Sequence, residues 1–145
     1  MHDLHNTTRA QRVISPVAVG TTGTGQTGKI IDRQGFRGVE FICAYGSITA
    51  TNAVFSVTVK EGDVTGTMTS VANDDLLGTE ALAALPAQAT SRTSGVGKLV
   101  NTRIGYKGNK RYVSCGVAWT SVTAATIVAI GAVLHSPMVA PVDNP

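Results

Sequence analysis

A glycine-rich segment at residues 23–29 has the spacing of a loop that binds the phosphates of a nucleotide. Its sequence, GTGQTGK, fits the first seven positions of that pattern. Such a loop needs a Ser or Thr directly after the lysine to hold magnesium, and a helix whose N-terminus meets the phosphate. Here Ile30 follows Lys29, and residues 31–35 do not favour a helix. We therefore predict a flexible surface loop and not the site of a nucleotide hydrolase.

The two cysteines are the other residues with reactive side chains. Cys43 and Cys115 each lie in an apolar segment, on the side of the expected strand that carries the apolar residues. Neither has a histidine or a second cysteine at the spacing of zinc ligands, and neither has a nearby base. We therefore predict two buried free thiols, and neither a metal site nor a thiol nucleophile.

The histidines and paired carboxylates show no arrangement for catalysis. His2 and His5 lie in a polar N-terminal stretch, and His135 ends an apolar segment. None lies beside an acid that would orient it toward a nucleophile. Asp74 and Asp75 are adjacent where a helical segment is expected to start, a position at which carboxylates more often cap a helix. The chain is therefore predicted not to be an enzyme and to have no cofactor.

The composition favours strands over helices. Of 145 residues, 43% are hydrophobic, only 14% are charged and 16 are glycine, while the β-branched residues Thr and Val dominate the rest. Apolar residues alternate along residues 37–45 and 54–60, and residues 61–63 are predicted to turn the chain. Gly and Pro keep the one helical segment, residues 73–86, short. We therefore predict an all-β fold, a β-sandwich or jelly roll of about eight antiparallel strands with one short helical turn.

The last third of the chain shows the strongest strand pattern. A Lys-Gly-Asn-Lys turn at residues 107–110 predicts a hairpin between residues 98–106 and 111–120. Residues 124–134 are apolar on both faces, so we predict a strand that is covered on both sides. The segment has only about half the length of a membrane span, so we predict no membrane contact. The core covers one face, and a loop or partner subunit covers the other. The core or dimer candidates are Ile127, Val128, Ile130 and Val133.

The chain is predicted to form a single domain with two short extensions. Residues 1–12 are polar without periodicity and are expected to form a flexible arm. Residues 13–142 form the β-sandwich domain, and residues 143–145 form a C-terminal tail.

Charge is unevenly distributed along the chain. The first 80 residues contain eight acids and six bases, whereas residues 81–142 contain no acid and six bases. Two interpretations are open. Either the bases form a face that attracts an anionic partner, which would be a nucleic acid or an acidic protein surface, or they are the ordinary polar residues of a hairpin. Only Tyr106 and Tyr112 lie among these bases, and no recognition motif is present. We therefore predict no direct contact with nucleic acid.

Several segments of the second half resemble those of a viral protein family. They are residues 104–113 (IGYKGNKRYV), the apolar residues 127–134 followed by His135-Ser136-Pro137, and residues 75–80 (DLLGTE). In this layout the chain resembles the cement, or decoration, proteins of tailed-phage heads, and is similar to the jelly-roll cement protein of Bordetella phage type. The resemblance implies a homodimer or trimer on the outer capsid surface, bound to the major capsid protein. It also implies synthesis in the cytoplasm of a bacterial host, and no catalytic residue.

We therefore expect a structural virion protein that clamps neighbouring major capsid subunits. A head-tail connector or tail component is the alternative among virion proteins, and a carbohydrate-binding β-sandwich is the alternative from another class. The expected capsid contacts lie in the arm, the glycine-rich loop and the basic hairpin, and are Leu4, Arg9, Arg12, Thr22, Thr24, Lys107, Lys110 and Arg111.

Overall fold

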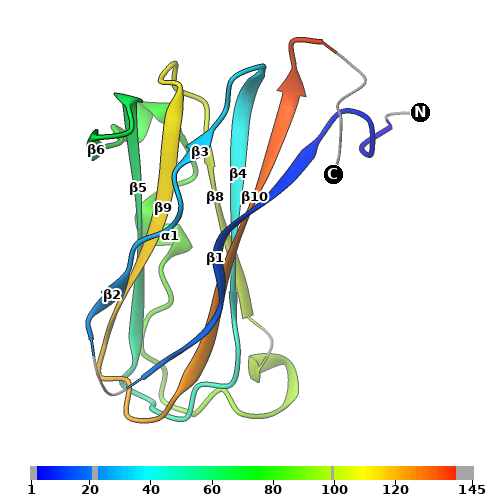
Figure 1. Ribbon diagram of the computed structural model, residues 1–145. Coiled ribbons are helices and arrows are strands. Elements are labelled where there is room, and N and C mark those ends of the chain that lie inside the picture. Colours follow the sequence, from blue (N-terminus) through cyan, green and yellow to red (C-terminus); the bar gives the residue numbers. More distant parts are fainter. Residues whose placement is uncertain (1–2, 21–22, 99, 140–145) are drawn as a thin grey trace.

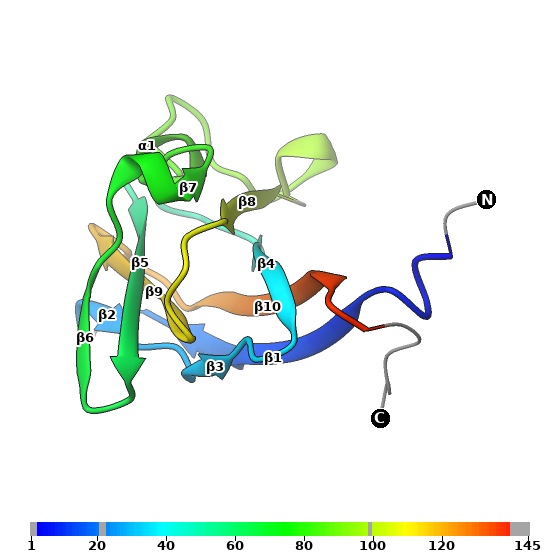
Figure 2. The same cartoon turned by 90° about the horizontal axis from the view of Figure 1, so that it is seen from above.

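The protein is a sandwich of two antiparallel β-sheets, which Figures 1 and 2 show as two layers. The computed structural model describes residues 3–20, 23–98 and 100–139. Sheet A contains, in spatial order, β1 (Arg9–Val19), β10 (Thr126–Pro137), β4 (Phe36–Tyr45), β8 (Val100–Tyr106) and β7 (Leu76–Leu77). Sheet B contains β2 (Gly25–Gln26), β9 (Tyr112–Thr120), β5 (Val54–Val64) and β6 (Thr67–Ser70), and β3 (Ile31–Asp32) also pairs with β9. The predicted all-β sandwich is therefore confirmed.

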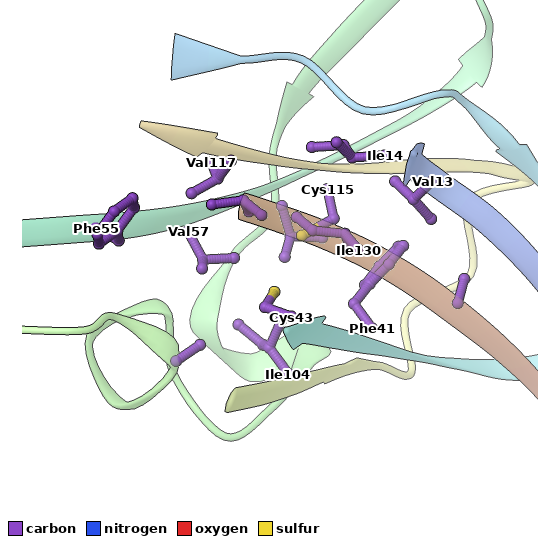
Figure 3. Close-up of a cluster of buried hydrophobic side chains, with 14 of the residues drawn as sticks. Val13, Ile14, Phe41, Cys43, Phe55, Val57, Ile104, Cys115, Val117 and Ile130 are labelled. Carbon is purple, nitrogen blue, oxygen red and sulfur yellow. The ribbon is translucent and has the colours of Figure 1, made fainter. Parts of the chain in front are cut away.

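The core lies between the two sheets and is built from the predicted alternation of side chains. Phe41 and Cys43 of β4 and Phe55 and Val57 of β5 are buried in the same cluster (Figure 3). Intervening residues such as Ser56 face solvent. Because strand side chains alternate between the two faces, each sheet has one face in this core and one face directed outward.

The segment between residues 106 and 112 does not form the predicted hairpin. β8 pairs with β4 and β7, whereas β9 pairs with β5, so residues 107–111 cross from sheet A to sheet B. We call this crossing the basic arch. The buried guanidinium of Arg33 explains it, because it donates hydrogen bonds to the carbonyls of Lys110 and, at 2.5 Å, of Gly108. The turn residues predicted a reversal of the chain correctly, but not the sheet to which the chain returns.

The end of β5 also differs from the prediction. Residues 61–63 were expected to turn, but β5 continues to Val64 and the chain turns before β6 begins at Thr67. A register shift between Glu61 and Val64 accommodates Gly62, where a Cβ atom would lie 2.4 Å from the Thr67 carbonyl oxygen. Gly62 therefore allows β6 to lie close to β5, and it does not form the predicted turn.

The N-terminal arm is shorter than predicted. β1 begins at Arg9, and Arg9 and Arg12 pair with Leu134 and Gly131 of β10. The register shifts along β1 allow this edge strand to continue past Pro16, as edge positions tolerate a missing N–H donor. Residues 3–8 form a turn in which the Asp3 side chain accepts backbone hydrogen bonds. The predicted tail, residues 143–145, lies outside the described residues.

The helical segment contains a 3-10 turn (Asn73–Asp75) and one short helix, α1 (Glu80–Ala83). Thr79 caps α1, because its hydroxyl accepts a hydrogen bond from the Leu82 N–H at 3.1 Å. Asp74 and Asp75 lie within the 3-10 turn and do not cap it through their side chains. The capping role predicted for the two carboxylates therefore belongs to Thr79.

Candidate functional site

The glycine-rich loop is tied to the sandwich by pairing and packing. Within it, β2 pairs with β9, and the backbone N–H of Trp119 donates to the Thr24 carbonyl at 3.0 Å. The chain after Lys29 continues into β3, so the motif lacks the helix that a phosphate-binding loop requires. Thr24 is exposed, and Thr22 lies outside the described residues.

Gly28 is required by packing in this loop. A Cβ atom at this position would lie 2.0 Å from the Cys115 carbonyl oxygen and 2.5 Å from the Val13 side chain. The next residue, Lys29, donates its backbone N–H to the Val13 carbonyl at 2.9 Å. Gly28 therefore allows the loop to fit between β1 and β9, and it fixes the backbone of Lys29 beside β1.

Two cations of the basic arch are already paired with carboxylates. Lys110 lies 2.5 Å from Asp63, and Arg111 makes two hydrogen bonds to Asp32, at 3.0 and 2.7 Å. These hydrogen bonds raise the pKa of Lys110 and of Arg111, and the Arg111 guanidinium lowers the pKa of Asp32. Arg111 also lies over the ring of Tyr112. These predicted contact residues therefore carry little uncompensated charge.

A buried polar cluster beneath the arch was not predicted from the sequence. Besides its bonds to the arch, Arg33 donates to the Arg37 carbonyl at 2.9 Å and lies over the Tyr106 ring. The Tyr106 hydroxyl donates to Glu61 and accepts from the Lys110 N–H at 3.0 Å. Burial and Glu61 raise the pKa of Tyr106. All these groups are engaged with each other, so the cluster holds the arch in place.

The two thiols lie in the core, as predicted. Cys43 comes from sheet A and Cys115 from sheet B, both side chains are buried, and Figure 3 shows their sulfur atoms directed toward one another. The hydrogen bond with Cys43 and burial raise the pKa of Cys115. Because a thiolate is the nucleophilic form, this environment opposes nucleophilic chemistry at Cys115.

The outward face of sheet A carries a group of apolar side chains. On β10, Val128 and Ile130 point into the core, whereas Ile127 is 50% exposed and Val133 is partly exposed. The register places other apolar side chains on the same outward face of β4 and β7. We call this surface the outer apolar patch, and its members are Ile42, Ala44, Leu77, Ile127, Ala129 and Val133.

Two of the predicted arm residues meet the glycine-rich loop. Arg9 and Arg12 of β1 and Lys29 of the loop line one hollow on the surface, although Lys29 lies 17 positions after Arg12. Leu4, also predicted as a contact, is 70% exposed in the turn before β1. The structure thus brings together residues from two of the predicted contact regions, the arm and the glycine-rich loop. The basic arch, which contains the third set of predicted contacts, does not line this hollow.

Comparisons with known proteins identify the fold alone. No family model and no curated protein matches the chain. Among solved structures, the PBSX exported protein XepA is similar with a TM-score of 0.52 and 17% identity, over 99% of this chain but only 42% of XepA. The CBM22-1 xylan-binding domain from Paenibacillus barcinonensis Xyn10C is similar with a TM-score of 0.43 and 10% identity, over 95% of this chain and 94% of that domain. The last likeness is too distant to support any functional argument.

The part of the chain that the structure describes has neither a cluster of metal ligands nor a helix that could span a membrane. It contains no group of three or more His, Cys, Asp and Glu residues able to hold a metal ion. No helix there has the length and apolar character needed to cross a membrane.

Proposed function

We propose that this chain is a structural virion protein, a cement protein that binds the outside of a phage head and clamps neighbouring major capsid subunits. The outer apolar patch is the observation that supports this most directly. β10 is apolar on both faces, but the core covers only the face of Val128 and Ile130. Among the described residues Ile127 keeps half of its surface exposed, and we propose that another molecule supplies the remaining cover.

The patch suits association between copies of the chain. Ile42, Leu77 and Ile127 are 41%, 45% and 50% exposed on one sheet face. Removing such side chains from water contributes about 25 cal/mol per Å² of apolar area. Glu40 and Arg103 lie on the same face, 3.8 Å apart, so a two-fold axis close to this pair would set each acid near the base of the other copy. We therefore propose a homodimer in which two sheets A pack together.

A dimer that clamps a shell can act through contacts that are individually weak. Once one subunit of the dimer binds the head, the second binds at a high effective concentration. The exposed residues outside the patch, among them Leu4, Thr24 and Lys107, are the proposed contacts to the major capsid protein. This arrangement resists the internal pressure of packaged DNA by linking neighbouring subunits.

The carbohydrate-binding alternative has less support in this molecule. Carbohydrate recognition on a β-sandwich would use exposed aromatic side chains, but Trp119, Tyr45 and Tyr106 are buried, and Arg111 covers Tyr112. A shallow hollow on the outward face of sheet B is lined by Gly25, Gln26, Thr27, Thr58, Lys60, Ser114, Gly116, Val117 and Ala118. It therefore offers no aromatic ring against which a sugar could stack.

Adding the purified protein to heads that lack it tests the proposal. We expect hundreds of copies to bind each head and the temperature of DNA release to rise. The Ile127→Asp variant should give less protection, and Ser56→Asp, on the outward face of sheet B, should protect like the wild type. Binding of only a few copies would favour the head-tail connector, and unchanged heat resistance with full occupancy would exclude a cement role.

A further inference from the structure

A basic pocket lies between β1 and the segment that leads into β3, two elements that are neighbours in Figure 2. It consists of two adjoining hollows of about 430 and 330 Å³ that share Arg9, Gln11 and Lys29. Arg12 lines the second hollow, and Asp32 lines the first. We define the basic pocket by Arg9, Gln11, Arg12 and Lys29.

The positive charge of the pocket is uncompensated. Among the described residues, none of Arg9, Arg12 and Lys29 forms an ion pair. Asp32, the acid that lines the pocket, makes its two hydrogen bonds to Arg111. Three cations gathered without a counter-ion repel one another, and an anion bound among them removes this repulsion. The pocket therefore differs from the basic arch, where Lys110 and Arg111 are paired.

One nitrogen of the pocket is buried without a hydrogen-bond partner. The Nε atom of Arg9 is inaccessible to solvent and donates no hydrogen bond within the protein. A buried donor that lacks an acceptor is unfavourable, because it loses its hydrogen bonds to water and gains none. A carboxylate or phosphate oxygen is the acceptor that a guanidinium binds most strongly. Since the Nε atom is closed to solvent, a carboxylate oxygen can reach it only if the Arg9 side chain moves, and this movement would give the donor the partner that it lacks within the protein.

The backbone holds these cations in place before any ligand binds. Arg9 and Arg12 lie on β1, which is paired with β10 along its length. Lys29 is fixed beside them by its hydrogen bond to Val13 and by the close packing at Gly28. Ligand binding therefore needs only side-chain adjustment, which limits its entropic cost.

We propose that the basic pocket binds the carboxylates of an acidic protein segment. A nucleic acid is less suited, because the three cations form a compact cluster, not a track along a backbone, and no aromatic side chain lines the two hollows for base stacking. The binding of carboxylates by the pocket does not depend on the proposed function. Only the identification of the partner as the major capsid protein rests on it.

Fluorescence anisotropy with a labelled hexaglutamate peptide tests the pocket without any phage head. We expect the wild type to bind the peptide, with affinity that falls as salt is raised from 50 to 200 mM. Arg9→Gln and Lys29→Gln should each weaken binding about tenfold, because each removes a charge-assisted hydrogen bond. Lys98→Gln, which removes an exposed cation outside the pocket and outside the proposed contacts, should bind like the wild type.

Three results would overturn the proposal. They are absence of peptide binding, an equal loss with Lys98→Gln, and tighter binding of a single-stranded oligonucleotide that Arg9→Gln and Lys29→Gln both abolish. Thermal unfolding of each variant verifies the fold, and Lys29→Gln changes an exposed side chain, so at least one informative variant remains folded. If the wild type binds the peptide but does not bind phage heads, the proposed function is contradicted, whereas the proposal for the basic pocket is supported.

Discussion

The two outward faces of the sandwich differ in chemistry, although both sheets contribute side chains to the same core. Sheet A presents the outer apolar patch, centred on Ile42 and Ile127. Sheet B presents hydroxyls and small residues, among them Ser56 and Thr58, with Lys60 beside them. Water solvates the second face well, but the first leaves apolar area exposed. In the proposed homodimer, sheet A is therefore the side that a second copy of the chain would bury.

The two faces of β10 give the largest contrast. Ile130 is 1% exposed, and Ile130→Ala is expected to lower the free energy of unfolding by about 2–5 kcal/mol through lost burial and a core cavity. Ile127→Ala, on the outward face of the same strand, should change it by less than about 1 kcal/mol. Urea denaturation of both variants at low protein concentration measures the difference. Equal losses would mean that the outward face is covered within the monomer.

The next contrast compares sheet A with sheet B. Ile127→Asp places a charge in the outer apolar patch and should weaken self-association about 100-fold, because burial in the interface would strip water from the carboxylate. Ser56→Asp introduces the same charge on the outward face of sheet B and should leave self-association unchanged. Sedimentation equilibrium measures both constants. Similar behaviour of the two variants would contradict the functional difference between the faces.

The sequence predicts the inward face of each sheet better than the outward face. Alternation identified Phe41 and Phe55 as core residues, because the period of a strand fixes which side chains share a face. It could not settle β10, where both faces are apolar and only the folded chain shows that Ile127 lies uncovered. The order of apolar residues along a segment indicates which side chains favour burial. It does not indicate whether the same chain or another molecule covers them.

Contacts between distant segments explain the remaining differences from the predictions. The turn at residues 107–110 is visible in the sequence, but its crossing between sheets depends on Arg33, more than 70 positions earlier. The basic pocket likewise combines Arg9 with Lys29, which were predicted in separate segments. An unpaired donor such as the Arg9 Nε cannot be identified from sequence, because its status depends on every neighbouring element.

The smallest expected effect concerns the ion pairs beside sheet B. The pKa of Asp32 is lowered in the folded protein, so its pairing with Arg111 stabilises the fold above the ordinary Asp pKa of 3.8 and is lost as pH falls below it. Because the pair is largely exposed, Asp32→Asn should lower the melting temperature at pH 7 by at most about 3 °C. At pH 2.5 the difference between wild type and variant should shrink. A scanning calorimetry series over this range measures it, and a constant difference down to pH 2.5 would show that the loss arises from packing and not from charge.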